Sequence, residues 1–118
     1  MIWVEIGESK YLQKKGLQEN GLFARRTFPK NSTIGVFRGE RMTEKQADLR
    51  LDTKWQIKLA SGDVVVDMVA SDCKLKFVNR ADRRRDQNCM IRTVGRQAVL
   101  VALKSIAAGD ELLAWYEV

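Results

Sequence analysis

Alternating apolar and polar positions mark several short stretches of this 118-residue chain. Successive side chains of a β-strand point to opposite faces, so such alternation predicts strands with one buried face. Glycine, asparagine or proline separates most of these stretches, which favours tight turns between strands. The predicted strands cover residues 2–6, 22–28, 33–37, 55–59, 64–69, 89–94, 97–103 and 111–116.

The segments between the strands predict turns, loops and a single helix. The Asn20–Gly21 pair predicts a tight turn, because both residue types tolerate positive φ. Thr43 and Gln46 have the spacing of a capping box, which predicts a short helix over residues 44–51. Residues 70–76 predict a loop or one helical turn, residues 80–88 predict an exposed loop, and the polar segment 8–20 predicts no regular element.

This arrangement predicts a mostly-β domain. Many short strands with one or two short helices favour several small sheets rather than one large sheet. The pairs 55–59 with 64–69, and 89–94 with 97–103, each predict a β-hairpin with a glycine-containing turn. The length predicts one domain spanning residues 1–118, and the hydrophobic content of 45% favours a globular fold.

The composition also bears on location. No apolar run approaches the roughly 20 residues that a membrane helix needs. An acidic residue, Glu5, lies close to the N-terminus, which departs from the pattern of a signal peptide. We therefore expect a soluble intracellular protein with no membrane partner, and the sequence does not indicate a compartment.

The absence of histidine excludes several kinds of site. The chain has no histidine, so zinc sites of the mixed Cys/His kind, Ser-His-Asp catalysis and Cys-His catalysis are all excluded. Cys73 and Cys89 lack a C-x-x-C spacing and predict two unpaired thiols. We therefore expect no metal site.

The charge leaves two interpretations open. The net charge of +6 and the pI of about 9.6 favour an acidic partner, such as nucleic acid, an acidic protein or an anionic ligand. The same excess of basic residues also serves solubility. Arg83, Arg84 and Arg85 can likewise contact an acidic substrate or form a solvated loop.

Several short sequence blocks, separated along the chain, occur in the same order as blocks of the SET domain and resemble them. The SET domain is a family of S-adenosylmethionine-dependent protein lysine methyltransferases. The resemblance covers about residues 16–116 and is nearest to the PR-type branch, whose ending is similar to Glu111–Tyr116. Trp55–Ile57, Val66–Asp67 and Lys76–Asn79 also follow that branch. The blocks are Gly21–Ala24, Gly39–Glu40, Phe77–Asn79, Gln87–Cys89 and Gly109–Tyr116.

The resemblance implies a fold and a reaction. Small β-sheets would surround a C-terminal pseudoknot, in which the Asn79 segment and the last strand pass beside each other. The cofactor would be S-adenosyl-L-methionine, and the methyl acceptor a lysine side-chain amine of a protein substrate. Nucleic acid would not be required for this reaction.

The resemblance also implies roles for individual residues. Tyr116 would be catalytic, Asn79 would hold the amino-acid end of the cofactor, and the backbone around Arg80 would meet its adenine. Trp55 and Trp115 would either wall the substrate channel or belong to the core. The full set implied to bind the cofactor is Gly21, Leu22, Phe23, Ala24, Phe77, Asn79 and Arg80.

The chain departs from many relatives in two ways. Arg80 stands where they have histidine, and no cysteine-rich zinc-binding tail follows Tyr116. Three alternatives then stay open: an open site, a site closed by a second subunit of a homodimer, or a catalytically weak SET-like module. Such a module would bind protein or nucleic acid through its basic surface.

Overall fold

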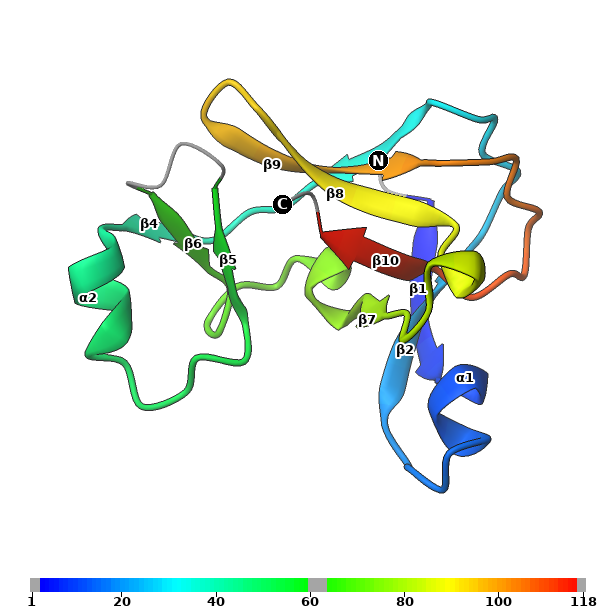
Figure 1. Cartoon of the computed structure of the whole chain (residues 1–118), viewed down its shortest axis with the longest axis horizontal. Helices are drawn as coiled ribbons and strands as arrows, with labels where there is room; N and C mark the ends of the chain where they lie inside the picture. Colours follow the sequence, from blue (N-terminus) through cyan, green and yellow to red (C-terminus); the bar gives the residue numbers. More distant parts are fainter. Residues whose placement is uncertain (1–2, 60–63, 117–118) are drawn as a thin grey trace.

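The computed structural model describes residues 3–59 and 64–116, with the side chain of Tyr116 outside this description. Within these residues, short strands form three small sheets, connected by two short α-helices and two 3₁₀ helices (Figure 1). The mostly-β prediction is therefore confirmed. One of the sheets pairs β1 (Val4–Glu8) with β2 (Asn20–Ala24) in antiparallel fashion.

The five-stranded sheet contains the last strand of the chain in an interior position. Its order is β3, β9, β8, β10 and β7. β10 runs parallel to both of its neighbours, whereas the β3–β9 and β8–β9 pairs are antiparallel. β10, named here the threaded strand, thus lies between β7 and β8, so the expected close passage of the Asn79 segment and the last strand is confirmed. The bounds are β3 Thr33–Val36, β7 Asn79–Arg80, β8 Cys89–Val94, β9 Gln97–Ala102 and β10 Leu113–Tyr116.

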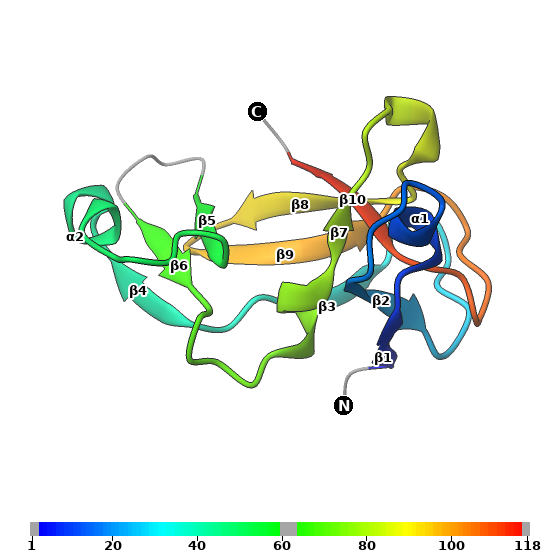
Figure 2. The same cartoon turned by 90° about the horizontal axis from the view of Figure 1, so that it is seen from below.

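The three-stranded sheet lies at the other end of the molecule (Figure 2). Its order is β4 (Glu40–Met42), β6 (Val65–Asp67) and β5 (Gln56–Lys58), with both pairs antiparallel. The helix α2 (Glu44–Asp48) follows β4. Its predicted capping box is present: the Thr43 hydroxyl accepts from the Gln46 N–H at 3.1 Å, and the Gln46 side chain accepts from the Thr43 N–H at 3.0 Å.

One buried cluster connects the three sheets. Hydrophobic side chains from β1, β2, β5, β6, β8, β9 and β10 pack together in it. Its fully buried members include Val4, Leu22, Leu75, Leu100 and Leu112. A second, smaller cluster lies under α2 and consists of Met42, Ala47 and Val65.

Some local predictions are wrong. The Asn20–Gly21 pair starts β2 instead of forming a turn, because it pairs with Gly7 and Glu8 of β1. β1 therefore extends past Gly7, where the alternation predicted an end. The helix α1 (Lys10–Gln13) and the strand β4 lie in segments where no regular element was predicted.

Other predictions hold with altered bounds. Both predicted hairpins form, although the turn at residues 61–63 lies outside the described residues. The predicted helix over residues 44–51 ends at Asp48. The segment 70–76 contains the expected single turn as the 3₁₀ helix η1 (Lys74–Phe77), and the predicted loop 80–88 contains the 3₁₀ helix η2 (Arg84–Asp86).

The two cysteines are unpaired, as predicted, and both are buried. Burial raises the pKa of the Cys89 thiol from 9.0 to about 12, and a backbone hydrogen bond from Leu113 lowers it in part. In the described part of the chain, no helix is long and apolar enough to span a membrane, and no cluster of potential metal ligands occurs.

Candidate functional site

A cavity of about 300 Å³ opens between the two larger sheets. Its floor is apolar and its rim is polar, a combination that is typical of small-molecule sites. Residues from β5, η1, β7 and β8 line it, together with Glu19 and the first residue of β2, Asn20. The floor includes Phe37, Ile57, Met68, Leu75 and Ile91, and the rim includes Glu19, Asn20, Lys54, Lys76 and Asn79.

Two aromatic rings form one wall of the cavity. The Trp55 and Phe77 rings meet edge to face, with centroids 5.5 Å apart and planes inclined by 70°. Trp55 is half-buried and packs against the main core, so it is at once a core neighbour and a cavity wall. Its role as a wall of the substrate channel stays a prediction.

Two ammonium groups flank this aromatic wall. Lys76 Nζ lies 5.4 Å from the Trp55 ring centroid and 5.5 Å from that of Phe77, and it donates to the Ser71 carbonyl at 2.7 Å. Lys54 Nζ lies 4.9 Å from the Trp55 centroid and 4.0 Å from a Glu19 carboxylate oxygen. The rim therefore carries fixed charges of both signs.

Asn79 stands where β2 and the threaded strand converge. It pairs in register with Leu113 of β10, and its side-chain Nδ2 donates to the Asn20 carbonyl at 2.9 Å. A Cβ added to Gly21 would lie only 3.2 Å from Asn79 Nδ2. The absence of a side chain at Gly21 therefore allows the Asn79 amide to approach β2.

Glu111 binds the start of the N-terminal helix α1 next to Gly21. Its carboxylate accepts from the fully buried Ser9 hydroxyl at 2.6 Å and from the Tyr11 N–H at 3.0 Å. The same carboxylate lies 2.6 Å from the position of a Cβ added to Gly21. Glu111, Ser9 and Asn79 thus enclose Gly21 on three sides.

The three residues after Gly21 mainly build the fold. Leu22 and Ala24 are buried, and their carbonyls accept from the N–H groups of Leu112 and Gly109. Phe23 pairs with Glu5 of β1 and forms an isolated bridge with Glu111. None of the three borders the cavity.

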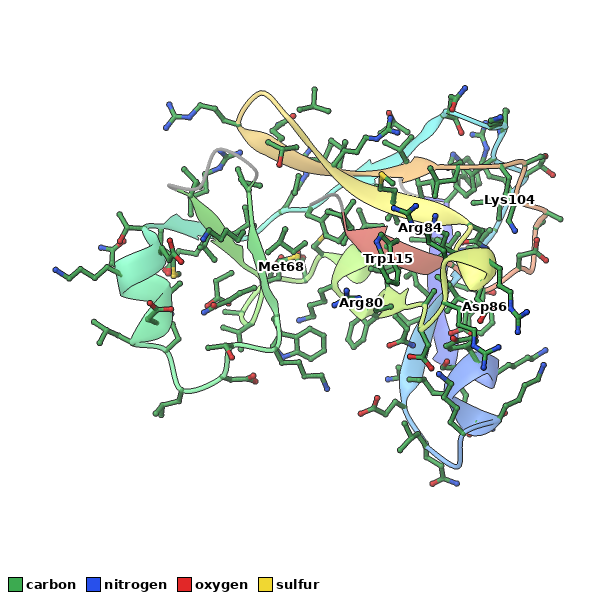
Figure 3. The ribbon with its side chains drawn as sticks, viewed as in Figure 1. Met68, Arg80, Arg84, Asp86, Lys104 and Trp115 are labelled. Carbon is green, nitrogen blue, oxygen red and sulfur yellow. The ribbon has the colours of Figure 1, made fainter. Side chains whose placement is uncertain are left out.

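Arg80 and Trp115 lie together at the side of the threaded strand. The Arg80 guanidinium carbon lies 5.0 Å from the Trp115 ring centroid, a cation–π arrangement (Figure 3). Trp115 is half-buried, and its place in the core or in a substrate channel stays a prediction. Arg80 begins the segment 80–88, named here the arginine loop, which protrudes from one side of the sheet (Figure 2).

Tyr116 is described only by its backbone. It is the last residue of β10 and pairs with Ile91, which lines the cavity. The residue implied to be catalytic is therefore on a strand next to the cavity. The position of its hydroxyl lies outside the description.

Sequence reasoning did not select four polar residues of the cavity rim. Lys76 directly precedes Phe77 in a block that carried the family resemblance, so its place in that block was the available signal. Asn20 was interpreted as a turn residue. For Glu19 and Lys54 no sequence signal existed, because their ion pair joins segments 35 residues apart.

Comparisons with known proteins agree with this architecture. The fold is similar to that of the methyltransferase domain of human PR domain-containing protein 2, with a TM-score of 0.73 and 24% sequence identity. The match covers 100% of this chain and 79% of that chain, and at this identity it supports the fold alone. A search of curated proteins found no matching sequence. The family model for the SET domain matches residues 19–117, and the chain therefore belongs to the SET-domain family.

Proposed function

We propose that this domain transfers a methyl group from S-adenosylmethionine to a lysine side-chain amine of a protein substrate. The observation that carries the proposal is the convergence of Gly21, Asn79 and the threaded strand β10 beside a cavity. Membership in the SET-domain family supports methyl transfer as the class of reaction.

The residues around the cavity fit such a cofactor. The Asn79 amide and the Asn20 carbonyl bind each other, which leaves one amide N–H and one carbonyl lone pair for a ligand, and Lys76 and Glu19 offer both charges. A zwitterionic amino-acid end needs this combination of groups. The aromatic wall of Trp55 and Phe77 suits a flat or cationic group. The volume of about 300 Å³ is at the lower end for small-molecule sites.

Bound S-adenosylmethionine supplies a methyl group on a positively charged sulfur that is already a good leaving group. The protein then has mainly to align the amine and exclude water. A lysine amine has an ordinary pKa of about 10.4 and must first lose a proton. Burial against the apolar floor lowers its pKa, so the chain can act without a histidine base. In this proposal the Tyr116 hydroxyl orients the amine.

Calorimetric titration with S-adenosylmethionine tests the cofactor site without knowledge of the substrate. We expect saturable binding that Asn79→Ala weakens about tenfold, the loss of one hydrogen bond to a charged group. Gln97→Ala is a matched control, because Gln97 is an exposed amide on β9, away from the cavity. Absence of binding at millimolar cofactor, or an equal loss in both variants, would contradict the proposed site.

A second variant tests the catalytic role of Tyr116. We expect Tyr116→Phe to bind the cofactor normally and to transfer methyl groups at least about a hundredfold more slowly, or to change the number of methyl groups added. Mass spectrometry of lysine-containing peptides incubated with enzyme and cofactor measures both quantities. An unchanged rate and product would remove Tyr116 from the mechanism.

A further inference from the structure

The arginine loop concentrates positive charge beside the candidate site. It carries Arg80, Arg83, Arg84 and Arg85, of which the last three are exposed and lie in or next to η2 (Figure 3). The loop starts directly after Asn79, which lines the cavity. Both of its ends are fastened to the threaded strand: Ala81 N–H donates to the Ala114 carbonyl, and Asn88 N–H donates to the Leu113 carbonyl, both at 3.0 Å.

The acidic residues of the loop are already engaged. Asp82 forms an ion pair with Lys15, and its N–H donates to the Tyr11 hydroxyl at 3.0 Å. The Asp86 carboxylate accepts from the same Tyr11 hydroxyl at 3.4 Å. Tyr11 of α1 and Lys15, two residues after that helix, therefore engage both aspartates.

Basic residues of this chain differ in whether a carboxylate pairs with them, and the three exposed arginines form a consecutive group without such a pair among the described residues. Arg25, Arg50 and Lys58, for example, each lie against a glutamate. Among the described residues, no ion pair or side-chain hydrogen bond engages Arg83, Arg84 or Arg85. Three guanidinium groups without an internal carboxylate leave a surface that is complementary to an anionic partner.

We propose that the arginine loop recognises an acidic segment of the protein substrate, next to the target lysine. The inference rests on the proposed function, because only a methyl acceptor has to lie beside the cavity and the arginine loop at once. A guanidinium group binds a carboxylate through two parallel hydrogen bonds, which favours aspartate or glutamate side chains. A substrate segment rich in lysine and arginine would meet repulsion here.

Binding of matched peptides tests this inference. The probes are short fluorescein-labelled peptides with one central lysine, flanked by glutamate, glutamine or arginine, and fluorescence anisotropy measures their binding. We expect the glutamate peptide to bind most tightly and its binding to weaken with added salt. The triple variant Arg83→Gln, Arg84→Gln, Arg85→Gln should weaken it about tenfold, as expected for three solvent-exposed ion pairs.

A charge-matched control separates local recognition from net charge. Lys30, Lys45 and Arg96 are exposed and do not line the cavity, so their triple glutamine variant removes the same charge at a distance from the site. Its binding of the glutamate peptide should stay within about twofold of the unmodified protein. An equal loss in the two triple variants, or no preference among the three peptides, would overturn the inference.

Two further measurements distinguish a failure of this inference from a failure of the proposed function. If a labelled single-stranded oligonucleotide binds more tightly than the glutamate peptide at the same salt, the surface serves nucleic acid and the inference is wrong. Calorimetry with S-adenosylmethionine on the arginine triple variant should give unchanged binding. If the cofactor does not bind the unmodified protein, the proposed function fails, whatever the peptides show. If the cofactor binds without any peptide preference, only the inference fails.

Discussion

The two larger sheets of this protein are built in different ways. The three-stranded sheet β4–β6–β5 comes from the contiguous stretch 40–67, and its hairpin and helix cap are local. The five-stranded sheet joins strands from residue 33 to residue 116, with its last strand inserted between β7 and β8. Local pairing costs little chain entropy, whereas the distant pairing has to be supported by a larger buried core.

Because of this difference, we expect the three-stranded sheet to affect only local stability and the five-stranded sheet to affect both stability and the candidate site. Val66 of β6 faces the main core, and its neighbour Val65 faces the small cluster under α2, as the pleat of a strand requires. Changes in the small cluster should therefore remain local. Changes at the threaded strand should affect both folding and the candidate site, because Asn79 pairs with that strand and Gly21 lies against Glu111, two residues before it.

The largest expected effect concerns the core at the threaded strand. Leu112 is fully buried and its N–H donates to the Leu22 carbonyl at 2.8 Å. Leu112→Ala should lower the free energy of unfolding by about 3 kcal/mol, the usual loss for a deeply buried leucine. Met42→Ala in the small cluster should lose roughly half as much, because that site borders solvent and relaxes more easily. Urea denaturation measures both, and equal losses would remove the distinction between the two sheets.

The next effect tests the crowded environment of Gly21. A Cβ at this position would lie 2.6 Å from Glu111 Oε2, which accepts from the Ser9 hydroxyl, while the Tyr11 N–H holds Oε1 of the same carboxylate. Gly21→Ala should therefore cost about 2 kcal/mol of stability and weaken cofactor binding about tenfold.

A glycine in the β8–β9 turn provides the control for that substitution. Gly95 has φ of +61° and open space around it. Gly95→Ala should cost about 1 kcal/mol through backbone strain and leave cofactor binding unchanged. Calorimetry and urea denaturation check both variants, and equal cofactor affinities would show that Gly21 does not serve the site.

A third prediction concerns the pH dependence of stability and rests on Cys89 in β8 of the five-stranded sheet. Burial raises the pKa of the Cys89 thiol to about 12, above the ordinary value of 9.0 that it regains on unfolding. The unfolded chain then releases this proton first, so the free energy of unfolding should fall by about 1 kcal/mol per pH unit between pH 9 and pH 12. Cys89→Ala should lack this component. Equal slopes for the two proteins in urea denaturation against pH would contradict it.

The smallest effect should come from the helix cap beside the three-stranded sheet. Thr43→Ala removes the hydroxyl that accepts from the Gln46 N–H and should cost less than about 1 kcal/mol. Thr43→Ser retains the hydroxyl and should behave like the unmodified protein. Thermal denaturation measures the loss, and cofactor binding should not change. A large loss of cofactor binding would show that the two ends of the molecule are coupled.

Predictions from the sequence were accurate for elements whose partners are local and failed for elements whose partners are distant in the chain. The capping box and the two hairpins were predicted because their partners are close in sequence. The turn at Asn20–Gly21 was wrong, because strand pairing with β1 outweighed the local preference. The helix α1 was missed because it has only four residues and is fastened by Glu111, about a hundred residues away.

The candidate site was predicted only in part. Family resemblance selected Trp55, Phe77 and Asn79, which all line the cavity. It also selected Leu22 and Ala24, whose carbonyl groups are occupied by the segment before β10. Composition and periodicity could not have selected any of these residues, because the cavity arises from segments that meet only in the folded chain.

The sequence by itself determined the strand-rich character of this protein, its unpaired thiols and the absence of imidazole chemistry. Alternation and composition are sufficient for these properties because they depend on single residues or near neighbours. Tertiary structure alone decided that β10 inserts between β7 and β8, that Glu111 encloses Gly21, and that the rim of the cavity carries both charges. The physical reason is that these short strands satisfy their backbone hydrogen bonds only through partners far away in the chain.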